Sequence, residues 1–255
     1  MDKLLGIIAR LRGPSGCPWD RVQTHDSLKP YLLEESYEML EALDGNDDRA
    51  LVDEMGDVLL QLLLHAQLKA EKKRFTFNDV VARLTEKMIF RHPHVFGERR
   101  IRGLNALHRQ WDQLKLQEKG QRGQKSKSVF DGIPKRFSAL MSSQKIQSRV
   151  AKDGFDWPNA RGPLNKVKEE LRELSRETGK ARRSRQRIRQ ELGDLLFSVV
   201  NLCRKLDVCA ELALLECNRR FQSRYLRLLR QQGGLPTSPR LRERAWKTAK
   251  RKTRP

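Results

Sequence analysis

The sequence predicts an all-α protein made of two tandem helical repeats. Leucine is abundant and aromatic residues make up only 6% of the chain, a composition that favours helices. No alternating run of β-branched residues reaches the length of a strand. One ordered pattern of acidic, basic and aromatic residues also occurs twice. These observations predict an N-terminal repeat at 1–118, a polar linker at 119–130 and a C-terminal repeat with a basic tail at 131–255.

The helices of the first repeat follow from apolar spacing and from the residues that stop a helix. Leu4, Ile8 and Leu11 fall on one face of an N-terminal helix, which ends at the Gly- and Pro-rich stretch "GPSGCPWD". Pro93 in "RHPHVFG" breaks a later helix. We therefore expect helices over about 1–12, 27–44, 49–73, 78–90 and 103–119.

The second repeat is expected to follow the same order. The loop "DGFDWPNARGP" contains a tryptophan, as "GCPWD" does in the first repeat. An unusually basic loop at 176–189 separates two of its helices. We expect helices over about 135–151, from Leu164, from Glu191 to Leu206, around Arg220 and Arg224, and around Trp246 and Lys250.

The net charge of +21 is concentrated in the second half of the chain. Residues 1–127 hold 22 basic and 19 acidic residues, a net charge of +3, whereas residues 128–255 hold 31 and 13, a net charge of +18. Such a surface suits a polyanionic ligand, weak and nonspecific contact with nucleic acid, or solubility alone. The sequence contains no helix-turn-helix, RNA-recognition or zinc-finger pattern that would support base-specific reading.

Cysteine usage and hydropathy indicate a cytoplasmic protein. The four cysteines form no C-x-x-C pair, and three of them fall in an apolar helical region, so we expect reduced core residues. The N-terminus lacks the apolar stretch and cleavage site of a signal peptide. The longest apolar run is too short to cross a bilayer.

Each repeat pairs an E-E-x-x-E helix with an E-x-x-D at the start of the next apolar helix. The spacing in "EESYE" and "EELRE" lets three acids point into one space, and "DEMGD" and "QELGD" add two more. Five carboxylates close together need a counter-charge, and Mg²⁺ is a hard cation that prefers oxygen ligands. The candidate metal ligands are Glu34, Glu35, Glu38, Glu54 and Asp57 in the first repeat, and Glu169, Glu170, Glu173, Glu191 and Asp194 in the second.

Gly56 and Gly193 lie between the two acids of each E-x-x-D. Glycine inside a helix is less favourable than alanine by about 0.8–1.0 kcal/mol. We therefore expect another helix to approach closely at both positions.

Two pairs of residues, each one helical turn apart, follow the acids in each repeat. A pair of cations suits phosphate oxygens, and arginine binds two of them at once. A tryptophan one turn from a lysine suits a base together with a phosphate or sugar. The candidate substrate-binding residues are Lys87, Arg91, Trp111 and Lys115 in the first repeat, and Arg220, Arg224, Trp246 and Lys250 in the second.

Each motif alone has a simpler explanation. An E-E-x-x-E on a surface helix is most often solvated, and acids at a helix start suit the helix dipole. Tryptophan most often packs in a core. The recurrence of the whole set in the same order favours a magnesium nucleotide site over these separate explanations.

These residues resemble the MazG family of nucleoside triphosphate pyrophosphohydrolases. The resemblance rests on "GCPWD", "LEESYE", "DEMGDVLLQLL", "RHPHVFG", "GFDW", "EELRE", "QELGDLLFSVVNL" and the two Trp-x-x-x-Lys pairs. It implies helical hairpins that form four-helix-bundle units, completed by homodimerisation. It further implies hydrolysis of nucleoside triphosphates between the α and β phosphates, with Mg²⁺ or Mn²⁺, in nucleotide-pool cleaning or a stress response.

The resemblance also implies roles for individual residues. The ten acids above correspond to the family's metal ligands, and the listed cations and tryptophans to its substrate contacts. Arg187 sits where the family often has a lysine, and Gln190 replaces a common acid. As a hypothesis, a glutamate orients or deprotonates the attacking water while cations stabilise the departing pyrophosphate. The candidates for that glutamate are Glu35, Glu38, Glu170 and Glu173.

Two other functions fit the same sequence. One is a pyrophosphatase of the same helical class with a narrower substrate, such as dUTP or phosphoribosyl-ATP; the tandem layout disfavours it. The other is a basic nucleic-acid-binding protein without activity. A di-iron bundle is disfavoured because the E-x-x-H pairs that it needs are missing.

Overall fold

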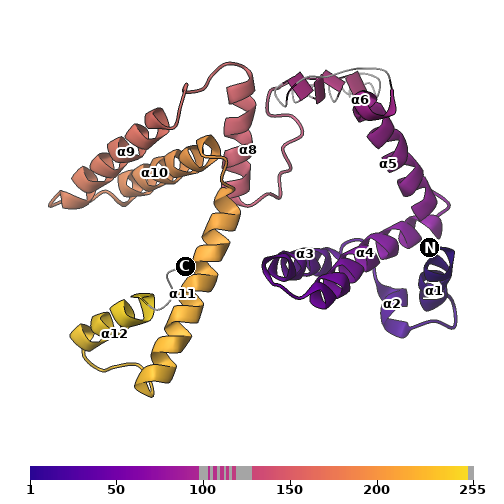
Figure 1. Ribbon diagram of the computed structural model, residues 1–255, viewed down its shortest axis with the longest axis horizontal. Helices are drawn as coiled ribbons and strands as arrows, with labels where there is room; N and C mark the ends of the chain where they lie inside the picture. Colours follow the sequence, from indigo (N-terminus) through magenta and orange to yellow (C-terminus); the bar gives the residue numbers. More distant parts are fainter. Residues whose placement is uncertain are drawn as a thin grey trace. The chain divides into compact units, whose positions relative to one another are not determined.

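The computed structural model of the chain contains α-helices and no strand among residues 1–97, 103, 106–107, 110–111, 113–114, 117–118 and 128–251, which are the residues it describes (Figure 1). The predicted all-α class is therefore confirmed. The chain divides into two compact units, Met1–Gln124 and Lys125–Pro255. Most of the helix predicted at 103–119, and of the linker predicted at 119–130, lies outside the described residues.

The helices of the first unit are α1 (Asp2–Arg12), α2 (Pro18–Val22), α3 (Lys29–Asp44), α4 (Asp48–Ala70), α5 (Phe77–Arg91) and α6 (Pro93–Phe96). Side-chain caps fix two of their boundaries. Asp47 accepts hydrogen bonds from backbone N–H groups of the first turn of α4, and Thr76 with Asp79 forms a capping box on α5. The predicted helices up to residue 91 are present, and α2 adds a short turn inside the predicted loop.

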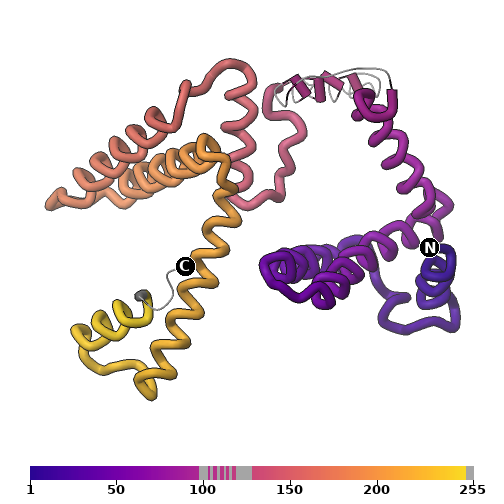
Figure 2. The backbone as a smooth tube through the Cα atoms, in the orientation of Figure 1, coloured from indigo at the N-terminus to yellow at the C-terminus, as the bar shows by residue number. Residues whose placement is uncertain are grey.

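The core of the first unit joins α1, the start of α3 and the second half of α4. Its buried side chains are Ile8, Leu28, Leu63, Leu64 and Leu68. The Arg12 guanidinium reinforces this contact, because its Nε lies 2.7 Å from Glu71 Oε1 at the end of α4. The packing holds α3 and α4 together as a hairpin, whose two helices lie side by side (Figure 2).

The helices of the second unit are α8 (Ala139–Lys152), α9 (Arg161–Gly179), α10 (Arg185–Lys205), α11 (Ala210–Gln232) and α12 (Pro239–Arg251). α9 and α10 form the counterpart of the α3–α4 hairpin, while α12 folds back against α11 (Figure 2). The prediction of a basic loop at 176–189 is wrong in its extent, because the loop is shorter in the structure. Ser184 caps α10 by accepting a hydrogen bond from the Arg187 N–H, so only residues 180–184 separate the two helices.

An ion-pair cluster fastens the loop before α9 to the end of α10. Asp156 lies 2.5 Å from Arg204 and 2.8 Å from Lys205, measured from carboxylate oxygen to nitrogen. Hydrogen bonding to Arg204, together with the contact to Lys205, lowers the pKa of Asp156 to about 2. Both hairpins are thus supported by a charged contact at the same end.

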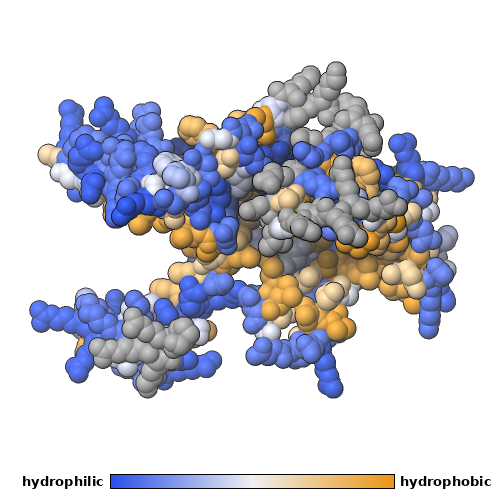
Figure 3. Space-filling view, turned by 45° about the horizontal axis from the view of Figure 1, so that its top comes forward, coloured by the Kyte–Doolittle hydropathy of each residue, from blue (hydrophilic) through white to orange (hydrophobic). Residues whose placement is uncertain are grey.

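Large hydrophobic side chains remain exposed on both hairpins and on α11. Leu33 is 58% exposed, Leu196 58% and Phe221 56%. Figure 3 shows hydrophobic side chains gathered at the surface rather than scattered singly. The cysteines predicted as core residues follow the same trend: Cys217 is exposed, and Cys203 and Cys209 are only partly buried, so that prediction is wrong. No helix within the described residues is long and apolar enough to span a membrane.

Candidate metal centres

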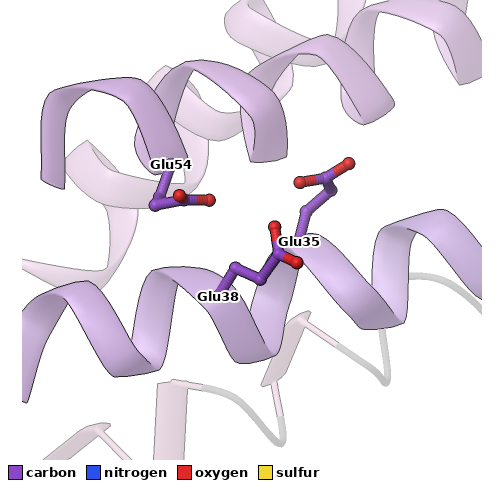
Figure 4. Close-up of side chains that lie close together, drawn as sticks. All are labelled: Glu35, Glu38 and Glu54. Atoms are coloured by element: carbon purple, nitrogen blue, oxygen red, sulfur yellow. The ribbon is translucent and has the colours of Figure 1, made fainter. Parts of the chain in front are cut away.

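The α3–α4 hairpin brings three of the predicted acids together. Glu35 and Glu38 lie one turn apart on α3, and Glu54 faces them from α4 (Figure 4). One carboxylate oxygen of each lies within 4.8 Å of the other two. The predicted convergence of the E-E-x-x-E and E-x-x-D motifs is therefore visible in these three side chains.

Electrostatic repulsion strains this cluster. Burial, followed by the charges of Asp57, Glu38, Glu34 and Glu54, raises the pKa of Glu35. Burial, followed by Glu38, Asp57 and Asp53, raises the pKa of Glu54. The Glu54 Oε2 atom is buried, and no described residue donates a hydrogen bond to it. No lysine or arginine of the described part of the chain forms an ion pair with Glu35, Glu38 or Glu54.

The α9–α10 hairpin repeats the arrangement at the matching positions. Glu170 and Glu173 of α9 and Glu191 of α10 place one oxygen each within 4.8 Å of one another. Burial, followed by the charges of Glu173, Asp194, Glu170 and Glu177, raises the pKa of Glu191. The two clusters correspond residue by residue, Glu35 to Glu170, Glu38 to Glu173 and Glu54 to Glu191.

Four predicted ligands border these clusters. Asp57 and Asp194 are exposed, and their charges raise the pKa values of Glu54 and Glu191. Glu34 is also exposed, and its charge acts on Glu35. Glu169 binds the same lysine as Glu170.

Two cations next to the second cluster were missed in the sequence. Lys166 Nζ lies 2.7 Å from Glu170 Oε1 and 2.8 Å from Glu169 Oε1. Hydrogen bonds to these two carboxylates raise the pKa of Lys166. Arg176 lies 3.0 Å from Glu173. The spacing K-x-x-E-E is the signal that could have identified Lys166, because it places the lysine three and four residues before the acids.

The predicted phosphate-binding cations do not all point at the acids. Arg91 pairs with Glu118, its Nε lying 3.0 Å from Oε2, and Arg220 pairs with Glu216 at 3.1 Å. Lys87 is half-buried on α5. Arg224 follows Arg220 by one turn of α11, as predicted. Arg187 lies exposed in the first turn of α10; a hydrogen bond from Lys180 lowers the pKa of Glu177, and the charge of Arg187 adds to this effect.

The predicted tryptophans contact other aromatic rings. Trp246 of α12 packs against Phe221 of α11 with ring centroids 5.0 Å apart, and Lys250 is exposed one turn later. Trp111 packs edge-on against His92 at 5.6 Å. Lys115 lies outside the described residues, so the spacing of the first Trp-x-x-x-Lys pair remains a prediction.

The prediction of a close helix contact at the two glycines is wrong within the described part of the chain. A side-chain carbon added to Gly56 or to Gly193 would meet no atom of the described residues within 4 Å, the glycine's chain neighbours and the helix's own backbone aside. The helices of each hairpin therefore do not require a missing side chain at these positions.

The donor set fits a hard divalent cation. All close donors are carboxylate oxygens, the ligands that Mg²⁺ and Mn²⁺ prefer. The buried Glu54 Oε2 without a hydrogen-bond donor in the described residues fits the same interpretation. Burial and then mutual repulsion raise the pKa values of Glu35, Glu54 and Glu191, and a cation would relieve the repulsion.

Comparison with known proteins agrees with this geometry. The family model described as the MazG nucleotide pyrophosphohydrolase domain matches residues 23–96 and 163–225, and each segment contains one acidic cluster. The chain is 43% identical over 227 residues to a nucleoside triphosphate pyrophosphohydrolase/pyrophosphatase of Thermotoga maritima, covering 89% of this chain and 84% of the relative. It is 42% identical over 226 residues to the Escherichia coli K12 nucleoside triphosphate pyrophosphohydrolase, covering 88% and 85%.

Proposed function

The chain belongs to the MazG nucleotide pyrophosphohydrolase family, and we infer that it hydrolyses nucleoside triphosphates between the α and β phosphates at its acidic hairpins. The products are a nucleoside monophosphate and pyrophosphate. The observation that carries the inference is the matched pair of glutamate clusters, one in each family-model segment. Two such clusters at corresponding positions are not expected of solvated surface acids.

We assign the metal-binding role to the close glutamates, with the bordering acids in support. These residues are Glu34, Glu35, Glu38, Glu54 and Asp57, and Glu169, Glu170, Glu173, Glu191 and Asp194. Mg²⁺ is the proposed ion and Mn²⁺ the alternative. When bound, the ion supplies charge neutralisation for the triphosphate and lowers the pKa of a water in its shell.

The remaining steps belong to side chains of the protein. Glu38 or Glu35, and Glu173 or Glu170, accept the proton of the attacking water and orient it towards the α phosphorus. Lys166 is placed to exchange its carboxylate partners for a phosphate oxygen. Arg220 and Arg224, one turn apart on α11, suit the departing pyrophosphate. Trp246 offers an aromatic surface to the base.

A homodimer is the proposed assembly. The single chain leaves Met55, Leu171 and Leu196 at least half exposed on the faces of its hairpins. Two hairpins facing each other would bury such side chains and complete a four-helix bundle. The test is the molecular mass in solution, and a monomer at micromolar concentration would contradict the proposal.

The proposed setting is the cytoplasm, where nucleoside triphosphates occur, and the proposed role is nucleotide-pool cleaning or a stress response. The net charge of +18 over residues 128–255 supports weak, nonspecific contact with nucleic acid in addition. Such contact would weaken steeply with added salt. Salt-insensitive, sequence-selective binding would contradict it.

A pyrophosphate-release assay over ribo- and deoxyribonucleoside triphosphates tests the activity. We expect release with Mg²⁺ and loss of release with chelator. The double variant E54Q/E191Q should lose at least about a hundredfold in kcat/KM. An exposed acid on α3 provides the matched control, and E41Q should keep wild-type activity. Full turnover by E54Q/E191Q would reject both clusters as catalytic centres.

A further inference from the structure

A pair of histidines lies beside the core of the first unit, away from the acidic cluster. His25 precedes α3, and His65 lies on α4. Their Nδ1 atoms are 2.9 Å apart, and their rings stack with centroids 5.1 Å apart and an angle of 12° between the planes. A hydrogen bond between two Nδ1 atoms needs one donor and one acceptor. The contact therefore exists only while at least one ring is neutral.

The turn that carries His25 is firmly held. The Thr24 N–H donates to Ser27 Oγ at 2.9 Å, and the Ser27 N–H donates to Thr24 Oγ1 at 3.1 Å. Leu28, the next residue, has no exposed surface and packs in the core. The histidine pair thus joins the start of α3 to α4, at the end of the hairpin that lies away from Glu54.

The charges around the pair disfavour its protonation. Burial, then Lys69, His65 and Lys72, lowers the pKa of His25, and Asp26 opposes them. Burial, then Lys29 at the start of α3, lowers the pKa of His65. The Nε2 atom of His25 is buried, and no described residue offers it a hydrogen bond. A second N–H on this ring would therefore be left without an acceptor in the described structure.

The second unit provides an internal comparison. His25 stands ten residues before Glu35, and Ala160 stands ten residues before Glu170. His65 stands eleven residues after Glu54, and Leu202 stands eleven residues after Glu191. The α9–α10 hairpin forms with these apolar residues, so the hairpin architecture does not require a polar pair there.

We propose that His25 and His65 form a proton-operated latch, which holds the start of α3 on α4 while the rings are neutral and releases it when both are protonated. In the neutral pair one ring carries hydrogen on Nδ1 and the other on Nε2. Uptake of two protons from solvent places N–H on all four nitrogens, so the two Nδ1–H groups oppose each other. The latch belongs to the first unit alone, which loosens on acidification while the second unit does not.

Hydrogen exchange of the full chain, read by mass spectrometry without metal, tests the latch. The segment 24–35 is compared with its counterpart 159–170 in the same molecule, at pH 7.5 and 5.5, after correction for intrinsic exchange rates. Between these values a group that titrates at about 6.5 only when the segment is open changes the opening constant by about tenfold. We expect segment 24–35 to open at least tenfold more at pH 5.5, and segment 159–170 to change less than twofold.

Replacing both histidines with the residues of the second unit supplies the decisive variant. H25A/H65L should fold and lose the pH dependence of segment 24–35, whereas H94A, which alters a histidine outside the pair, should keep it. Equal opening of both segments on acidification, or an unchanged segment 24–35, would overturn the proposal. Nitrogen NMR of the wild-type imidazoles gives a second measure, and a titration midpoint above 6.5 for either ring would also overturn it.

Discussion

The two acidic hairpins place three glutamates alike and surround them differently. In the second hairpin Lys166 contacts Glu170 at 2.7 Å, and Arg176 contacts Glu173 at 3.0 Å. The corresponding positions of the first hairpin hold Tyr31 and Glu41. Among the described residues, the first cluster is thus a group of carboxylates without an ion-pair partner, whereas the second has cations at its edge.

The difference indicates that the two hairpins, although they share one motif, suit different tasks: metal binding alone, or binding of a metal together with a triphosphate. Carboxylates alone suit a metal ion, but a triphosphate is itself an anion and needs cations beside them. The second hairpin provides both, and Arg220 with Arg224 follows on the next helix. We therefore expect the second unit to turn over substrate and the first to bind metal with little turnover.

The largest effect should come from removing the α10 glutamate, whereas removing its α4 counterpart should have little effect. E191Q should lower kcat/KM for pyrophosphate release by about a hundredfold or more, because it disables the cluster with adjoining cations. E54Q, its match in the first unit, should change kcat/KM by less than about threefold. The opposite ranking of the two variants would assign catalysis to the first unit instead.

A smaller effect is expected from Lys166. K166M should raise KM about tenfold, since one charge-assisted hydrogen bond to phosphate is lost. Lys168, two residues along α9, is exposed, so K168M is the matched control and should leave KM unchanged. Steady-state kinetics at saturating Mg²⁺ measure both variants. An unaltered KM in K166M would show that this lysine serves the carboxylates alone.

The ion pairs that support the two hairpins should contribute different amounts to the free energy of unfolding. D156N should lower the free energy of unfolding by about 1–2 kcal/mol at pH 7, because its partners Arg204 and Lys205 are largely buried. The pKa of Asp156 lies at about 2, so this contribution is present above its ordinary value of 3.8 and lost as the pH falls towards 2. E71Q, on the more exposed side of the Arg12 pair, should have a smaller effect. Urea unfolding measures both.

The smallest effect concerns metal-free stability. The raised pKa of Glu54 means that its charge destabilises the folded state at pH 7. Without metal, E54Q should therefore melt slightly above the wild type at pH 7, and the difference should fade as the pH falls towards 4.5. Saturating Mg²⁺ should reverse the order, since the wild type binds the ion. A lower melting temperature for metal-free E54Q would show that Glu54 is not under repulsion.

Local spacing made much of the site predictable. Glu35 with Glu38, and Glu170 with Glu173, lie one turn apart on a helix, and such pairs share a face wherever the helix packs. The meeting of the two helices followed from the repeated E-x-x-D at the start of an apolar helix. Helix boundaries set by side-chain caps were less visible, and Ser184 extended α10 into a stretch that basic residues had marked as loop.

Contacts between residues far apart in the chain could not be predicted from the sequence. His25 and His65 are separated by 40 positions, and nothing in the spacing of either residue indicates the other. Arg91 meets Glu118 through the fold, which occupies a side chain predicted to bind phosphate. Lys166 belongs to a different case, because its spacing from Glu170 was informative but lysines are too numerous in this chain for one to stand out.

The open space beside Gly56 and Gly193 bears on what can pack against the two hairpins. Each lies at the same place in its hairpin, and each has open space where a methyl group would sit. Alanine there would favour the helix by about 0.8–1.0 kcal/mol, with no steric clash with the described residues. The open space on both helices therefore leaves room for the close approach of a second copy of the chain or of a nucleotide. We expect alanine at either position to leave the fold of the isolated chain intact and to hinder the binding of any partner that packs against that helix.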